Sequence, residues 1–367
     1  MGDPALEQRA KSLLDSIARS PRFAGSAEEV EARQICRREL EEAGFSCRDI
    51  PFEYSQWPGR WGPPLLAGVQ AATILGISRI EFQWGALRAI AFASSIAIVL
   101  VTLTARAKRG WIQNLRVQRS TSINLEAVRG APRIWLCAHL DSKSQTIPML
   151  VRIASAIALG VVTALAVVLL LVQLFAHRQL PSVWSALEIA AVVSALPSVF
   201  CWVGNNSRGA LDNATGVASV LMATKLPAAS KDLGVFISSG EELGLAGARV
   251  WAKNGDRNIK LLNCDTVDDN GGYRCMHTGR RPSDLIAAVE KSAADIGLKL
   301  ATGRLIPGIL ADSVAFADLD IPAVTLSRGN LSTLARIHTR RDTSNQLTGR
   351  GVAEAAHLLA ASTRELT

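Results

Sequence analysis

The chain has 367 residues, a formal net charge of +8, 49% hydrophobic residues and a mean hydropathy of +0.20. It is long enough for one large domain or two ordinary ones, with a sizeable buried core. The hydropathy is too high for a typical soluble enzyme and too low for a protein embedded wholly in a membrane. Apolar and polar segments must therefore be separate.

The polar N-terminal segment comes first in chain order. Residues 1–25 mix both signs of charge and do not resemble a secretory signal peptide, so we expect the chain to start on the side of synthesis. Residues 27–44 predict an amphipathic helix that ends at Gly44.

Two pairs of apolar runs predict membrane hairpins. The first pair, 65–77 and 89–105, flanks SRIEFQWGALR, and its first arm is short for a complete crossing. The second pair is 153–176, which has no charged residue, and 183–203, which contains only Glu188. We expect about four transmembrane helices, with buried helices of a soluble core as the weaker alternative, mainly for the first pair.

The arrangement of basic residues predicts the orientation. An even number of crossings returns every long polar segment to one side of the lipid bilayer, where six basic residues lie near the membrane: Arg60, Arg106, Lys108, Arg109, Arg116 and Arg119. The opposite connections offer Arg79, Arg88 and Arg178. The positive-inside rule then places the polar domain in the cytoplasm of an integral membrane protein. Six cysteines without a C-x-x-C pair agree with that reducing compartment. No basic stretch is interleaved with aromatic residues, so we expect no nucleic-acid partner.

The polar segments alternate between predicted strands and helices. Strands are predicted at 123–128, 133–138, 233–238, 259–264 and 322–327, and helices at 216–226 and 282–297. Alternation of this kind predicts an α/β domain with a mixed central β-sheet flanked by helices. The predicted domains are a discontinuous catalytic domain (1–60, 106–150 and 205–367) and hairpins at 61–105 and 151–204.

Polar residues of metal-ligand type follow these strands. His139 and Asp141 follow the strand at 133–138, Glu241 and Glu242 follow 233–238, and Asp265 follows 259–264. Asp212 opens a helix, and His338 lies near the C-terminus. Each residue alone has an ordinary structural explanation, such as a helix N-cap for Asp212. Ligands of open α/β sheets lie at strand ends, so the coincidence predicts a site.

The motifs AHLDS, GALDNATG, GEELGLAGA, NCDT and IHTRRDT, in this order, resemble the dizinc aminopeptidases of peptidase clan MH. That group includes bacterial leucyl aminopeptidases, glutamate carboxypeptidase II and glutaminyl cyclases. The resemblance spans residues 20–50 and 120–360 and implies a three-layer zinc-exopeptidase fold with two zinc ions per chain. It implies that His139 and Asp265 bind one zinc, that Glu242 and His338 bind the other, and that Asp212 bridges both.

The resemblance also implies two catalytic roles. Glu241 would be the general base, and Asp141 would accept the N–H of the His139 ring and fix its tautomer. Nitrogen and carboxylate ligands suit a catalytic zinc pair that activates water for peptide or amide hydrolysis. Cys137 and Cys264 lie in predicted strands, and we interpret them as buried core residues.

Two features depart from the family. Ile337 stands where many relatives have a tyrosine that stabilises the oxyanion, and Tyr273 or His277 could replace it. A membrane hairpin is inserted between Asp141 and Asp212, which suggests membrane-proximal peptide substrates, although the hairpins could be anchors only. The predicted function is a membrane-bound zinc aminopeptidase. The alternatives are a single-zinc glutaminyl-peptide cyclotransferase, with which Asp141-Ser142-Lys143 is compatible, and a non-catalytic receptor-like module. Oligomeric state stays open.

Overall fold

The computed structural model describes residues 3–108, 114–176, 178–306 and 309–367. The chain forms two compact units. The α/β unit comprises residues 1–54, 118–144 and 204–367, and the helical unit comprises 55–117 and 145–203. The helical unit begins earlier than the predicted hairpin at 61–105, because its first helix already starts at Trp57.

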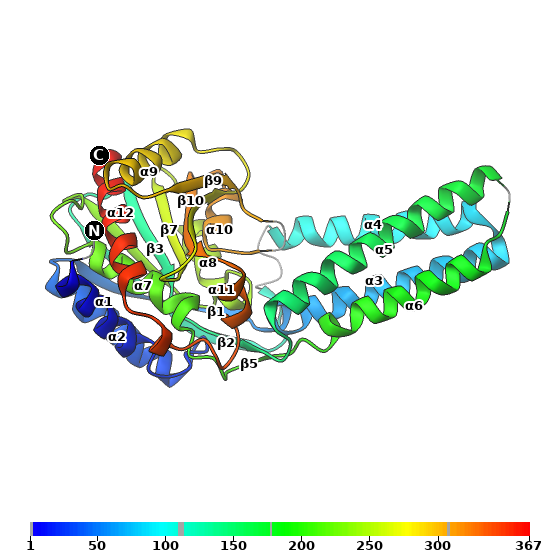
Figure 1. The fold of residues 1–367 in the computed structure, drawn as a ribbon, viewed down its shortest axis with the longest axis horizontal. Helices are drawn as coiled ribbons and strands as arrows, with labels where there is room; N and C mark the ends of the chain where they lie inside the picture. The colour runs from blue at the N-terminus through cyan, green and yellow to red at the C-terminus, as the bar shows by residue number, and fades with distance from the viewer. Residues whose placement is uncertain (1–2, 109–113, 177, 307–308) are drawn as a thin grey trace. The chain divides into compact units, whose positions relative to one another are not determined.

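An eight-stranded mixed sheet forms the centre of the α/β unit (Figure 1). Its strands, in spatial order, are β1 (Ser46–Ser55), β2 (Arg119–Arg129), β6 (Leu233–Ser238), β3 (Ile134–His139), β7 (Lys260–Val267), β10 (Ala323–Gly329), β8 (Gly272–His277) and β9 (Leu300–Arg304). β4 (Ser144–Gln145) and β5 (Val203–Gly204) form a separate two-stranded ribbon. The mixed sheet confirms the predicted fold class.

The four central strands β6, β3, β7 and β10 are parallel. β3 is buried along its whole length, which explains its continuous apolar run IWLCA. In the register, His139 pairs with Ser238, and Cys137 pairs with Asn263. Two residues farther along, His139 is level with Asp265. The register thus brings the ends of three strands to one edge of the sheet.

Helices cover both faces of the sheet (Figure 1). On one face, Trp135 of β3 and Phe236 of β6 pack on Trp251, with ring centroids 4.9 and 4.8 Å apart. Trp251 belongs to α8 (Ala246–Asn254), which packs with α10 (Ser313–Ala317). Side chains alternate along a strand, so Leu136 faces the other layer. That layer contains α1 (Pro4–Ile17), α2 (Ala27–Glu42), α7 (Thr215–Ala223), α9 (Ser283–Asp295) and α12 (Arg350–Glu365).

In its described residues, the helical unit consists of four long helices that lie side by side (Figure 1). They are α3 (Trp57–Trp84), α4 (Ala86–Lys108), α5 (Met149–Ala176) and α6 (Pro181–Val199). By length and composition, all four can cross a membrane. The first arm was predicted as short, which is wrong, because α3 extends through Pro63 and Pro64 and has 28 residues.

The surface of the helical unit is apolar, whereas polar contacts lie between its helices. Ile98, Val101 and Phe175 are 66%, 69% and 79% exposed. Inside, Gln70 donates to Thr163 at 2.7 Å, the hydroxyls of Ser155 and Ser198 are 2.7 Å apart, and Trp184 donates to Gln173 at 2.9 Å. Apolar surfaces outside and hydrogen bonds between helices are typical of membrane bundles.

Candidate metal centre

The candidate ligands converge at the edge where the parallel strands end. His139 is the last residue of β3, Glu241 and Glu242 follow β6, and Asp265 lies near the end of β7. Asp212 lies in the segment Ala210–Ala214, which leads into α7. His338 follows β10 and the short helix α11 (Leu331–Arg336). All are buried except Asp265, which is partly buried.

Unusual backbone angles at Gly240 and His338 orient three of these side chains. Gly240 has a φ of 69° and lets the chain turn directly after β6, so that Glu241 and Glu242 lie at the strand end. His338 has a φ of 60°, which is uncommon for a residue with a side chain and costs on the order of 1 kcal/mol. Such strain persists only where the surrounding structure fixes the residue.

Asp212 lies between the two histidines. Its Oδ1 is 3.1 Å from Nε2 of His139, and its Oδ2 is 2.9 Å from Nε2 of His338. Glu242 Oε1 is in turn 3.1 Å from the same His338 nitrogen. One carboxylate that faces both imidazoles, one with each oxygen, has the geometry of a bridging ligand.

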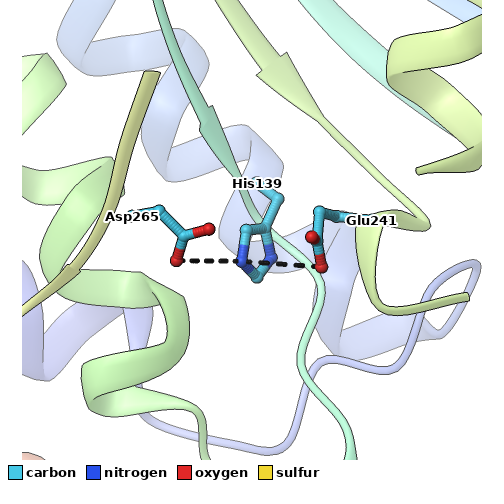
Figure 2. Close-up of side chains that lie close together, drawn as sticks. All are labelled: His139, Glu241 and Asp265. Carbon is cyan, nitrogen blue, oxygen red and sulfur yellow. Dashed lines mark ion pairs between the residues drawn. The ribbon is translucent and has the colours of Figure 1, made fainter. Parts of the chain in front are cut away.

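The cluster contains two groups with the geometry of a metal site. Ligand atoms of Asp212, Glu242 and His338 lie within 4.8 Å of one another, as do those of His139, Glu241 and Asp265. Figure 2 shows the His139 ring between the other two side chains. Its Nε2 is 3.7 Å from Asp265 Oδ1 and 3.9 Å from Glu241 Oε2.

The hydrogen bonds of His139 show that these residues fit a metal ion. Its Nδ1 is 3.0 Å from the backbone carbonyl of Asp141, and a carbonyl can only accept, so Nδ1 carries a proton. In the neutral ring, Nε2 then presents a lone pair to the carboxylate of Asp212. Two acceptors at 3.1 Å require a cation between them, either a proton or a metal ion. Nitrogen and oxygen donors of this kind suit zinc.

Asp141 is at the site, but it makes a different contact from the one predicted. Its backbone carbonyl, and not its carboxylate, receives the ring N–H of His139, and Oδ1 lies 3.7 Å from Nδ1. The carboxylate instead accepts the backbone N–H groups of Glu241 at 3.1 Å and Glu242 at 3.2 Å. The loop therefore presents its carbonyl to the ring, while the side chain fixes the glutamate pair.

Asp342 holds the backbone of Asp212 in the same way, and the sequence interpretation assigned it no role. Its carboxylate accepts the backbone N–H groups of Leu211 at 2.6 Å and Asp212 at 3.2 Å. Asp342 lies in the motif IHTRRDT, so the signal was present. A lysine, Lys143, was also missed as a neighbour of Glu242: its Nζ is 2.7 Å from Oε2.

The electrostatics of the cluster require positive charge. Burial lowers the pKa of His139, but the surrounding carboxylates, first Glu241, hold it well above its ordinary value. Burial raises the pKa of Asp212, but the two imidazoles outweigh it and hold this pKa well below the usual range. Burial, with the charges of Glu242 and Asp265, raises the pKa of Glu241 well above normal. A raised pKa makes the Glu241 carboxylate a stronger proton acceptor than an ordinary glutamate.

The remaining candidates lie outside the cluster. Burial raises the pKa of Cys137 and Cys264, which keeps them as thiols, and all six cysteines are free of disulfides. The structure does not support the suggestion that Tyr273 or His277 stabilises the oxyanion in place of the tyrosine that many relatives have at the position of Ile337. Tyr273 donates its hydroxyl to the carbonyl of Gly351 at 3.1 Å. His277 ends β8, which is antiparallel to β10, so it lies toward the opposite edge of the sheet.

Solved structures with the same fold include two aminopeptidases and a glutaminyl cyclase. The zinc aminopeptidase BSAP from Bacillus subtilis has a TM-score of 0.57 at 13% identity, with 98% of this chain and 95% of that chain covered. The aminopeptidase from Aneurinibacillus sp. strain AM-1 has a TM-score of 0.55 at 14% identity, with 98% of this chain and 93% of that chain covered. The Fimbriiglobus ruber glutaminyl cyclase has a TM-score of 0.54 at 15% identity, with 99% of this chain and 95% of that chain covered. At these identities the likeness concerns the fold.

The sequence family is shown by a separate comparison. No curated protein matches the chain. The model of Peptidase family M28 matches residues 124–363, a range that begins within β2, ends within α12 and contains every candidate ligand. The chain therefore belongs to peptidase family M28 and is a metal-dependent hydrolase.

Proposed function

We propose that the protein is a membrane-bound zinc aminopeptidase that removes N-terminal residues from peptides. The observation that carries this proposal is the pair of imidazoles facing one carboxylate, His139 and His338 on Asp212, which is a donor set for two ions. His139 and Asp265 would hold one zinc and Glu242 and His338 the other. Family membership and the zinc aminopeptidase fold support the same chemistry.

Each residue has a role that follows from its position. When bound, zinc ions lower the pKa of water and polarise a carbonyl. Glu241, buried beside His139, would take the proton from the attacking water and pass it to the leaving amine. Asp141 keeps the backbone of Glu241 in place, and burial of the site strengthens each electrostatic interaction.

The test is hydrolysis by the full chain in detergent. A peptide with a free N-terminal amine should be shortened by one residue, and its N-acetylated form should be resistant. Chelation should abolish the activity, and zinc should restore it. A peptide with N-terminal glutamine separates the alternative activity, because cyclisation releases ammonia without shortening the peptide. Cyclisation alone, or no turnover in zinc-loaded protein, would contradict the proposal.

We propose further that four helices anchor the protein, with the α/β unit in the cytoplasm. Their length, hydropathy and exposed apolar side chains support insertion. Fluorescent protein and periplasmic phosphatase, each fused after Thr367, report opposite sides of a bacterial inner membrane. Fluorescence without phosphatase activity is the expected result, and the reverse pattern would contradict the orientation.

The substrates that we propose are membrane-proximal or amphipathic peptides. Lys143, which contacts Glu242, is six residues before Met149, the first residue of α5, and six residues reach no farther than about 21 Å. In vesicles, a lipid-anchored peptide should be cleaved faster than its soluble counterpart. A variant without the α5–α6 hairpin that keeps the same preference would show that the helices serve only as anchors.

A further inference from the structure

Lys143 places a partly buried positive charge beside one of the two candidate ion positions. Its Nζ lies 2.7 Å from Oε2 of Glu242 and also donates to the backbone carbonyl of Glu242 at 3.2 Å. The Lys143 side chain is 12% exposed and that of Glu242 is 4% exposed. Little water can therefore screen this ammonium group from the site.

The contact divides the two oxygens of Glu242 between two partners. Oε2 faces Lys143, whereas Oε1 faces Nε2 of His338 at 3.1 Å. Only Oε1 is then directed to an ion shared with His338 and Asp212. Glu242 is limited to a single ligand oxygen, and part of its negative charge is already balanced.

The second position has a different electrostatic environment. It lies between His139 and Asp265, and the carboxylates of Glu241 and Asp212 are also close to the His139 ring, at 3.9 and 3.1 Å from Nε2; Figure 2 shows Glu241 and Asp265 on either side of this ring. A divalent ion there is surrounded by negative charge. An ion held by Glu242 and His338 would share the Glu242 carboxylate with the Lys143 ammonium group, and like charges repel strongly where little water screens them.

We propose that Lys143 lowers the zinc affinity of the Glu242–His338 position and so makes occupancy of that position depend on the free zinc concentration. This inference rests on the proposed zinc function. It assigns Lys143 an effect on the ion and not only on the position of Glu242. If Lys143 served only to hold Glu242 in place, its removal would weaken zinc binding, so the two roles predict opposite signs.

The experiment measures zinc per chain in the full-length protein, dialysed in detergent against buffers of stepped free zinc concentration. Lys143→Met and Lys143→Gln remove the charge, and Lys143→Arg keeps it. We expect both neutral variants to half-saturate one position at a free zinc concentration lower by on the order of tenfold or more. The arginine variant should stay close to the wild type. Gel filtration and thermal unfolding show which variants are folded.

Single-position backgrounds locate the effect. His139→Ala leaves the Glu242–His338 position, and the charge-removing change should tighten zinc binding in that background. In the His338→Ala background, removal of the Lys143 charge should shift the zinc affinity clearly less. If the wild type binds zinc and the neutral variants bind it equally well or more weakly, the inference about Lys143 is overturned. The proposed zinc function would not be affected by that result. A wild type that binds no zinc would overturn the proposed function and the inference with it.

Discussion

Nε2 of His139 lies 3.1 Å from Oδ1 of Asp212, although the hydrogen bond of Nδ1 to a carbonyl leaves Nε2 as an acceptor in the neutral ring. This contact needs a cation. Asp212 also faces His338, so under the proposed function it is the ligand that both zinc positions would share.

Asp212→Asn should therefore reduce zinc binding at both positions. Asparagine keeps one oxygen and directs an amide N–H₂ toward the other imidazole, which repels a cation there. We expect less than one zinc per chain by elemental analysis, and peptidase activity at the background level. Asn213→Asp is not a suitable control, because the side-chain amide of Asn213 donates a hydrogen bond to the backbone carbonyl of Cys264. An exposed change such as Asp256→Asn serves instead and should keep full zinc content.

Glu241→Gln separates the general base from a ligand. As a base, Glu241 supplies a proton transfer worth about 10²–10⁴-fold in rate, so kcat should fall by that factor with zinc content unchanged. Glu242→Gln is the matched comparison, because it should lose zinc as well as activity. Loss of zinc from the Glu241 variant would instead assign Glu241 to the ion beside His139 and Asp265.

Asp141→Asn should impair catalysis without unfolding the protein. The carboxylate accepts two backbone N–H groups, and asparagine would present a donor to one of them, at a cost of about 1–3 kcal/mol. We expect a loss of about 10- to 100-fold in kcat/KM from displacement of the glutamate pair. Asp342→Asn should have a similar effect through the Asp212 segment. Full activity of the Asp141 variant would show that Asp141 is not needed to position Glu241 and Glu242.

Replacing residues 146–202 with a short glycine–serine linker should leave the metal centre intact. Hydrogen bonds within the α/β unit join the two ends of this insertion: Ser142 donates to the carbonyl of Ser207 at 3.2 Å, and Ser144 accepts the N–H of Asn206 at 2.9 Å. Arg22 donates to the carbonyls of Leu140 and Gly209, both at 2.9 Å. Zinc content should match the wild type, and its loss would show that the hairpin supports the ligands.

Glu29 gives the stability a pH dependence. Burial, and next the charge of Asp141, raise the pKa of Glu29 to about 7. The unfolded value is about 4.3, so the folded state binds this proton more tightly. The resulting stability is complete below the unfolded pKa and is lost as the pH rises through about 7. Relative to the Glu29→Gln variant, the free energy of unfolding of the wild type should fall by about 3 kcal/mol between pH 4 and pH 8. Parallel Tm profiles of the two proteins would contradict this.

Much of this architecture was predictable from the sequence. The strands β3 and β6 have continuous apolar runs, and the ligand motifs follow in an order that limits the fold to few possibilities. The length of α3 was underestimated because the segment WPGRWGPP interrupts the apolar pattern with proline and glycine. Pro58 stands in the first turn, which tolerates proline, but α3 also continues through Pro63 and Pro64 in its interior.

The contacts around the ligands could not be predicted in the same way. Spacing places Asp141 beside His139, but only the path of the backbone decides whether the carbonyl or the carboxylate meets the ring. Lys143 is 99 residues from Glu242 in the chain, so its ion pair depends on the packing of two loops. Asp342 likewise contacts residues 130 and 131 positions away.

The most direct test of the central claim is the zinc content of the wild-type protein, purified in detergent and saturated with zinc before gel filtration. We predict close to two zinc ions per chain in the wild type and less than one in Asp212→Asn. A folded protein without zinc, or with zinc that is retained in Asp212→Asn, would contradict it.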